Sequence, residues 1–428
     1  MSYELAIEGR FADPLNGVWK GFMGIEGGRI AYLTESPIQG RTRLTLSESE
    51  LVFPGFIDTH VHFREPGWEH KGDLASESRA AALGGVTTAM DMPNTPKPAT
   101  SRERILEKQR LAESKAAIDM LFYGGVGGGN LYTLEGMVDV VPGFKVYMSG
   151  TTGCLDLKDL EELEEAFSCL SGLGRPVVIH CEDMVMNKEA FGVHGSRFSE
   201  RGYLVHALSR PAESEVKAIG DALGLSRKHG LRLSVCHVST REGLGLIKRD
   251  GKAKAEATIH HSLMEQGDLE RLGSKGKMNP PLRERRDADY IFKSILSGEV
   301  DYVGTDHAPH TLEEKAFHFM EAPAGVPTVE HYGSFAALLL SKGMGPEDVA
   351  RVTSYNAARF FGMEGKGRIE EGFLADLAVL DTAGRVRVGP PYQAKCGWSP
   401  LEGMEFPGRV TRTIRRGRII AENGKVLI

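Results

Sequence analysis

The chain has 428 residues, of which 41% are hydrophobic and 26% are charged, and its formal net charge is −6. This length is sufficient for more than one structural unit. The charge balance lacks the basic excess of nucleic-acid-binding proteins, and no apolar run is long enough to span a bilayer. We therefore expect a small-molecule substrate, with neither a nucleic-acid nor a membrane partner.

Two features of the sequence, its first residues and its cysteines, indicate a cellular compartment. Residues 1–4 lack a signal-peptide pattern. The five cysteines are an odd number without zinc-type spacing, which favours reduced thiols over a disulfide framework. They are Cys154, Cys169, Cys181, Cys236 and Cys396. Together these features predict a cytoplasmic protein.

Both ends of the chain have the pattern of short antiparallel strands. Apolar and polar residues alternate within residues 1–50, with Gly-rich turns between them. The same alternation returns near the C-terminus, in residues 374–380, 410–414 and 418–420. We expect residues 1–52 and 366–428 to pair into one small flanking β-sandwich domain.

Between these ends, eight strand-like runs alternate with helix-like segments. The strands are expected at residues 53–59, 86–92, 118–123, 144–148, 176–180, 231–237, 253–260 and 300–306. The clearest helices are expected at residues 101–116, 156–170, 212–228 and 286–296. Eight such units predict an α/β fold, a closed (β/α)₈ TIM barrel over residues 53–365, whose chemistry lies at the C-terminal ends of the strands. A doubly wound sheet is the alternative.

His60 and His62 stand at the end of the first expected strand, shortly before Pro66-Gly67 ends that segment. Side chains two residues apart on a strand point to the same side. The two imidazoles can therefore bind one divalent metal ion. The alternative is an ordinary pair of partly exposed histidines at a strand terminus.

Further candidate ligands lie within or at the end of four other expected strands. Lys145 lies within the fourth, His180 and His237 end the fifth and sixth, and Asp306 ends the eighth. Each has an ordinary alternative: a hydrogen-bonded core histidine, a lysine that extends to solvent, or a helix-capping aspartate. In a barrel these ends meet at one rim, so the set predicts a metal centre there.

Six short motifs place the sequence close to a known family. It resembles the amidohydrolase superfamily and, within it, the dihydroorotases. The motifs that carry the resemblance are residues 60–67, 92–95, 180–183, 237–240, 277–283 and 306–310. They span most of the expected barrel, and the β-rich ends fit the companion domain of that superfamily.

The resemblance implies a binuclear centre of two divalent metal ions, for which zinc suits the nitrogen-rich ligands. His60, His62 and Asp306 are expected to bind one ion, and His180 and His237 the other. Lys145 resembles a lysine that is N-carboxylated by CO₂, so that its carbamate bridges both ions. Several bacterial dihydroorotases lack a lysine at this position and use a downstream aspartate, so Lys145 favours the carbamate-bridged arrangement.

The resemblance also implies substrate contacts. Arg64, Asn94 and His310 match positions that bind the carboxylate of dihydroorotate, for which a guanidinium fork is well suited. Asn279 matches a contact to the ring amide. Ala324 and Gly325 match main-chain contacts. The alternative for Arg64 is a surface ion pair with its neighbour Glu65.

The expected activity is reversible cyclisation of N-carbamoyl-L-aspartate to L-dihydroorotate and water, the third step of de novo pyrimidine biosynthesis. A metal-bridged hydroxide is the expected nucleophile in the hydrolytic direction, with Asp306 as general base and acid. Two alternatives are another cyclic amidase, such as an allantoinase or hydantoinase, and a non-catalytic partner subunit. The resemblance leaves open a homodimer and an association with aspartate transcarbamoylase.

Overall fold

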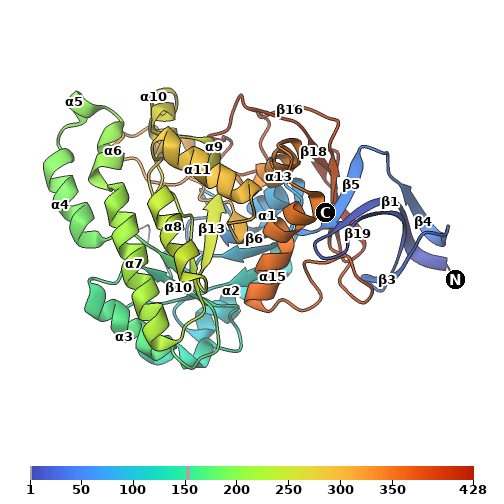
Figure 1. Cartoon of the computed structure of the whole chain (residues 1–428), viewed down its shortest axis with the longest axis horizontal. Helices are drawn as coiled ribbons and strands as arrows, with labels where there is room; N and C mark the ends of the chain where they lie inside the picture. Colours follow the sequence, from blue (N-terminus) through green and yellow to red (C-terminus); the bar gives the residue numbers. More distant parts are fainter. Residues whose placement is uncertain (1, 151–154) are drawn as a thin grey trace.

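The computed structural model describes residues 2–150 and 155–428. A large α/β unit and a smaller β-rich unit lie side by side, and the smaller one contains the N-terminus (Figure 1). Cys154 falls outside the described residues, and the other four cysteines are free thiols.

In the part of the chain that the structure describes, the larger unit is a barrel of eight parallel strands. They are β6 (Phe56–Val61), β7 (Val86–Asp91), β8 (Asp119–Phe122), β10 (Phe144–Tyr147), β11 (Val177–His180), β12 (Leu233–Val235), β13 (Lys254–Thr258) and β14 (Tyr302–Gly304). The third strand continues as β9 (Gly124–Gly125), which pairs with β10. A parallel bridge between Val61 and His307 joins the ends of the first and eighth strands. The predicted (β/α)₈ barrel is confirmed, and the doubly wound alternative is wrong.

Helices follow the strands and cover the outside of the barrel (Figure 1). Those after the first four strands are α1 (Leu74–Leu83), α2 (Arg102–Lys115) and α3 (Leu160–Leu170). Those after the fifth and sixth are α4 (Met184–His194), α5 (Phe198–Arg201), α6 (Leu204–Ser209), α7 (Ala212–His229) and α8 (Arg241–Asp250). The rest are α9 (Ile259–Leu263), α10 (Leu269–Leu272), α11 (Arg285–Leu296), α12 (Leu312–Lys315), α13 (Tyr332–Ser341), α14 (Pro346–Ala350) and α15 (Asn356–Phe361).

One helix begins later than its sequence pattern predicts. The expected start at residue 156 is wrong, because Asp156 forms a parallel bridge with Tyr147. The side chain of Asp159 then accepts a hydrogen bond from the backbone N–H of Glu162 and caps α3, which begins at Leu160. A local side-chain cap therefore decides the helix boundary.

The two ends of the chain pair with each other, as the sequence predicts. In the described residues they form one mixed sheet of nine strands. The N-terminal strands are β1 (Ser2–Asp13), β2 (Gly17–Glu26), β3 (Arg29–Thr34), β4 (Gln39–Thr45) and β5 (Glu50–Pro54). The C-terminal strands are β15 (Leu377–Asp381), β18 (Arg409–Arg415), β19 (Arg418–Glu422) and β20 (Lys425–Val426). Strand β5 pairs with β1 on one side and β15 on the other. The sheet is mixed because β1 pairs with β4 and β5 in parallel, so the expectation of purely antiparallel strands is wrong. Phe53 lies opposite Ala378 in that sheet, so the first barrel strand begins at Phe56 rather than at residue 53.

A segment near the C-terminus leaves this sheet and packs against the barrel. It contains the short hairpin strands β16 (Val386–Arg387) and β17 (Glu405–Phe406). Trp398 is buried among barrel side chains, and its indole Nε1–H donates to the carbonyl of His310 over 2.7 Å. The C-terminal region thus supports the barrel rim, which the sequence pattern did not indicate.

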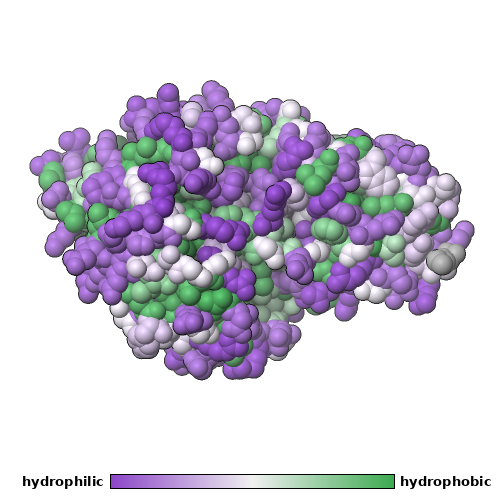
Figure 2. All heavy atoms as spheres, turned by 60° about the horizontal axis from the view of Figure 1, so that its bottom comes forward, coloured by the Kyte–Doolittle hydropathy of each residue, from purple (hydrophilic) through white to green (hydrophobic). Residues whose placement is uncertain are grey.

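Hydrophilic side chains predominate on the face shown in Figure 2, with apolar side chains gathered in patches between them. Within residues 2–150 and 155–428, no helix has both the length and the apolar character needed to cross a membrane.

Candidate active site

The C-terminal ends of the barrel strands enclose a cavity of about 50 Å³. Ten of the twelve site residues predicted from sequence line it: His60, His62, Arg64, Asn94, His180, His237, Asn279, Asp306, Ala324 and Gly325. Tyr147 and Ala308 complete the lining. An outer pocket of about 580 Å³ adjoins the cavity, and Asn279 and Ala324 line both.

Three residues that line this cavity have left-handed backbone conformations. Their φ angles are 68° for Arg64, 35° for His237 and 44° for Asp306. This region of φ is unfavourable for residues with a Cβ atom and costs on the order of 1–3 kcal/mol each. Strained backbone is therefore concentrated at the strand ends that carry the candidate ligands.

The side chains of His60, His62 and Asp306 meet at one point. The Nε2 atoms of His60 and His62 lie 3.3 and 3.1 Å from the same oxygen, Oδ1 of Asp306. Ligand atoms of His60, His237 and Asp306 all lie within 4.8 Å of one another. Two imidazoles and a carboxylate at these distances form a donor set that suits a divalent metal ion.

Hydrogen bonds fix which ring nitrogen of each histidine faces this point. The Nδ1–H of His60 donates to Oε1 of Glu256 over 2.8 Å, and the Nδ1–H of His62 donates to Oδ1 of Asn94 over 2.8 Å. In each neutral imidazole the proton is thereby held on Nδ1 and the lone pair lies on Nε2. In both rings Nε2 is the atom that faces Asp306; on His60, whose pKa is raised, Nε2 also carries a proton, which a bound cation would replace.

A second pair of histidines lies beside the first. Nδ1 of His180 and Nε2 of His237 are 3.0 Å apart, and the two rings have an edge-to-face arrangement. The Nε2–H of His180 donates to Oε2 of Glu182 over 2.9 Å, so its Nδ1 carries the lone pair. The rings of His60 and His237 have centroids 5.1 Å apart. All four predicted histidines thus form one cluster.

The charge state of the cluster favours metal binding. Burial lowers the pKa of His62 to about 4 and the pKa of His237 well below its usual value, so both rings are neutral at pH 7. Burial opposes ionisation of Asp306, but His60 and His62 outweigh it and hold the pKa of Asp306 well below its usual value. Burial also opposes protonation of His60, yet Glu256 and Asp306 raise its pKa to about 10. The carboxylates of Glu256 and Asp306 therefore stabilise a positive charge in this cluster, and a bound metal ion would supply one.

Lys145 is fully buried in β10 next to the histidine cluster. Its Nζ lies 3.0 Å from Sγ of Cys236 and 4.9 Å from the ring centroid of Tyr147. The sulfur of Cys236 in turn lies within 4.8 Å of ligand atoms of His60 and Glu256. These contacts put the lysine amine beside the histidine cluster, where a group carried on Nζ would be close to the candidate ligands.

Arg64 is buried beside the cluster, and the alternative of a surface ion pair with Glu65 is wrong. Its Nε donates to the carbonyl of Pro309 over 3.0 Å, and its Nη2 donates to Nε2 of His310 over 3.1 Å. Glu65 instead pairs with Lys115. The guanidinium is therefore held in one orientation at the cavity wall.

His310 does not line the cavity itself but supports Arg64 from behind. Its Nδ1 lies 3.3 Å from Oε2 of Glu314. Lys71 pairs with the other carboxylate oxygen of Glu314 over 3.0 Å. Burial, with Arg64 next in importance, lowers the pKa of His310 to about 3, so the ring is neutral and Nε2 can accept from Arg64.

Asn279 lies at the junction of the cavity and the outer pocket. The Nε2–H of His206, on α6, donates to Oδ1 of Asn279 over 3.0 Å and to the carbonyl of Met278 over 2.9 Å. The amide nitrogen is then the donor end of Asn279. No sequence motif connects His206 with this position.

Other residues that support the site were also not predicted from the sequence. Glu256, Lys71 and Glu314 had no assigned role, and Glu182 was noted only within a motif. Glu256 did carry a signal, since an acidic residue within an apolar buried strand needs a polar partner. The neighbouring His260 and His261 are buried on α9; His261 contacts Thr258 and the carbonyl of Pro280.

The fold and the cavity define the class of protein: a (β/α)₈ barrel with a candidate metal centre at the C-terminal ends of its strands. The sequence profile of the amidohydrolase family matches residues 51–420. The chain therefore belongs to the amidohydrolase family.

Similar proteins include cyclic amidases of several specificities. The chain is 34% identical to a dihydroorotase of Methanothermobacter thermautotrophicus, with 95% of this chain and 92% of that protein covered. It is 36% identical to an allantoinase of Rubrobacter xylanophilus, with 88% and 85% covered. Among solved structures, an L-hydantoinase of Arthrobacter aurescens superposes with a TM-score of 0.94 at 26% identity, with 100% of this chain and 98% of that chain covered.

Proposed function

We propose that this chain is a dihydroorotase, a hydrolytic enzyme that interconverts N-carbamoyl-L-aspartate and L-dihydroorotate in pyrimidine biosynthesis. The observation that carries the proposal is the position of Arg64. Its buried guanidinium faces the same cavity as His60, His62 and Asp306. A cation at this position suits a cyclic amide that also bears a carboxylate. Similarity to dihydroorotases over most of the chain supports the same conclusion.

The proposal includes two divalent metal ions, with zinc as the first candidate. His60, His62 and Asp306 would hold one ion, and His180 and His237 the other, with the N-carboxylated Lys145 shared between them. The neutral imidazoles of His62 and His237 and the ionised carboxylate of Asp306 fit this requirement. When bound, such ions activate a water molecule and polarise a carbonyl group.

Asp306 is the proposed catalytic residue. Its ionised carboxylate lies in the cavity with Oδ1 directed toward His60 and His62. It can take the proton of the attacking water and return it to the ring nitrogen as the amide C–N bond breaks. In the biosynthetic direction the same carboxylate removes the proton from the ureido nitrogen as the ring closes. Because the fold holds this carboxylate in position before the substrate reacts, the entropic part of the activation barrier is lower.

The remaining side chains orient the substrate. We propose that Arg64 and Asn94 bind the substrate carboxylate, with His310 contributing at the same end. The donor end of Asn279 would meet a carbonyl of the ring amide, and the backbone at Ala324 and Gly325 would meet the ring edge. Because all of these residues except His310 line one small cavity, the substrate would be held with little freedom to rotate.

Another cyclic amidase activity is the second candidate, and the similarity to an allantoinase favours it. Allantoin and hydantoin lack the carboxylate of dihydroorotate, so they offer nothing for the charge of Arg64 to bind. Rates with dihydroorotate, allantoin and hydantoin, measured on the same metal-loaded preparation, separate the candidates. A kcat/KM highest for dihydroorotate supports the proposal, and a preference for either other substrate contradicts it. Metal binding without turnover of any of the three would indicate a non-catalytic subunit.

The assembly belongs to the proposal as well. We propose a cytoplasmic homodimer, in which residues 1–52 and 366–428 form a domain separate from the barrel of residues 53–365. Light scattering of the purified chain tests the dimer. Co-elution with aspartate transcarbamoylase in size-exclusion chromatography tests whether the two enzymes associate.

A further inference from the structure

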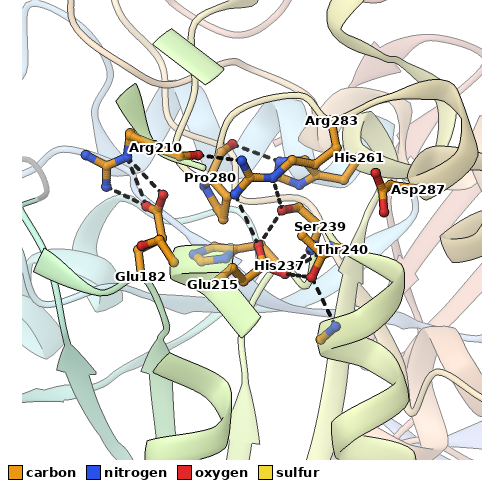
Figure 3. A network of polar contacts seen from close by, with 12 residues as sticks. Glu182, Arg210, Glu215, His237, Ser239, Thr240, His261, Pro280, Arg283 and Asp287 are labelled. Carbon is orange, nitrogen blue, oxygen red and sulfur yellow. Dashed lines mark hydrogen bonds and ion pairs between the residues drawn. The ribbon is translucent and has the colours of Figure 1, made fainter. Parts of the chain in front are cut away.

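Glu182 lies between a candidate metal ligand and an arginine. Its Oε2 accepts from Nε2–H of His180 over 2.9 Å. Both of its oxygens contact Arg210, with Nε of the guanidinium 3.0 Å from Oε1 and 3.1 Å from Oε2 (Figure 3). One carboxylate thus joins a ring nitrogen on the fifth barrel strand to a residue at the end of α6.

The Glu182 carboxylate is shielded from solvent, and Arg210 compensates its charge. The side chain of Glu182 is 0% exposed. Arg210 and His180 both contact this carboxylate, so its oxygens have hydrogen-bond partners although no water reaches them. A buried carboxylate with a two-point guanidinium contact is a strong, directional acceptor. It holds the proton of His180 on Nε2.

Arg210 is itself fixed by further contacts. Its backbone carbonyl accepts from Nη1 of Arg283, and Nε of Arg283 donates to Oγ of Ser239 over 3.0 Å. Ser239 follows His237 by two residues and also donates to Glu215. Figure 3 shows these contacts as one connected network of dashed lines that runs from Glu182 to Glu215. The segments that carry His180 and His237 are therefore held by the same set of contacts.

We infer that Glu182 and Arg210 are positioning residues for the second metal ion. They fix His180 with its proton on Nε2 and reserve Nδ1, which lies 3.0 Å from Nε2 of His237, for the metal. This inference rests on the binuclear centre of the proposed function. His60 has a corresponding partner in Glu256, whereas in the described residues the contacts of Glu256 are to His60, Thr59 and the backbone N–H of His237 rather than to an arginine.

The test measures metal binding rather than turnover. Wild-type apoprotein, Glu182→Gln, Arg210→Lys and the control Glu164→Gln are titrated with Zn²⁺ against a chromophoric chelator, and bound zinc is counted by mass spectrometry. Glu164 pairs with Lys228 on the surface and lies outside the network, so the control carries the same chemical change. Circular dichroism establishes that each variant is folded.

We expect Glu182→Gln to weaken one of the two zinc sites by roughly 10- to 100-fold and to leave the other close to wild type. Arg210→Lys keeps the charge but loses the two-point contact, so it should weaken the same site by a smaller factor. Glu164→Gln should bind as wild type does. If Glu182→Gln binds zinc at both sites with wild-type affinity, this inference is wrong but the proposed function stands. If Glu182→Gln does not fold, wild-type affinity at both sites in Arg210→Lys has the same meaning. Failure of the wild type to bind zinc overturns the proposed centre and this inference together.

Discussion

The Nδ1–H of His60 donates a hydrogen bond to Oε1 of Glu256 over 2.8 Å, and this contact joins the first barrel strand to the seventh. Both side chains are buried. The bond directs Nε2 of His60 toward Asp306 and so orients the first candidate ligand. The cavity thus depends on acidic residues that do not line it.

The first prediction concerns this hydrogen bond. Glu256→Gln removes the charge that fixes the His60 tautomer, so zinc affinity should fall by roughly 10- to 100-fold. Equilibrium dialysis followed by elemental analysis measures the effect. Glu107→Gln, which alters a surface pair with Arg104, is the matched control and should retain wild-type zinc content. Equal zinc content in both variants would show that Glu256 does not orient a ligand.

The second prediction concerns recognition of the substrate carboxylate. Arg64→Met removes the guanidinium, and loss of two charge-assisted hydrogen bonds of about 1.5–3 kcal/mol each should lower kcat/KM for dihydroorotate by at least about 100-fold. Zinc content should stay at the wild-type level. The kcat/KM of Arg64→Lys should lie between those of the wild type and Arg64→Met, because lysine keeps the positive charge but lacks the two-pronged guanidinium. Unchanged kcat/KM with dihydroorotate would contradict the assigned role.

The third prediction separates proton transfer from metal binding at Asp306. Asp306→Ala removes both the proton acceptor and one candidate ligand. We expect kcat to fall by about 100- to 10,000-fold, the usual contribution of a general acid or base, with part of the metal retained on the histidines. Parallel assays of kcat and zinc content give the answer. An unchanged kcat rules out Asp306 as the proton carrier.

The fourth prediction concerns carboxylation of Lys145. Lys145→Ala should lose bound metal, because the proposed bridging carbamate cannot form. Added acetate or propionate can supply a carboxylate in the vacated space and should restore part of the activity. Zinc analysis with and without the acid, together with turnover, provides the measurement. Full zinc content in Lys145→Ala without added acid would exclude a bridging role.

The fifth prediction concerns pH-dependent stability at Glu330, outside the cavity. Burial raises the pKa of Glu330 to about 7 although its carboxylate accepts from the backbone N–H groups of Gln393 and Ala394. The native state therefore favours the protonated form. This favourable contribution is complete below the unfolded-state pKa of about 4.5 and is lost as the pH rises through about 7.

Glu330→Gln keeps an acceptor oxygen and does not ionise. Relative to wild type, the variant should gain about 1–3 kcal/mol of stability between pH 5 and pH 8. Thermal unfolding midpoints of both proteins across this range measure the difference. Two parallel curves would mean that Glu330 does not titrate in the native protein within this range.

The sequence predicted the barrel well because its signals are local. Predominantly apolar runs such as residues 86–92 and 144–148 form buried strands, since their apolar side chains are removed from water. Boundaries were less accurate where a tertiary contact decided them. Phe53 belongs to the terminal sheet because it pairs with Ala378, more than 300 residues away in the chain.

The sequence by itself determined the eight strands, the pairing of the chain ends and the residue types at the strand ends. Only the tertiary structure decided how those residues meet: the shared oxygen of Asp306, the burial of Arg64 and the supports supplied by Glu182, Glu256 and His206. The physical reason is that strand periodicity acts over a few residues, whereas a buried charge is stabilised by whichever partner the fold brings near. Such partners are often far apart in the sequence, and the periodicity of a single strand or helix carries no information about them.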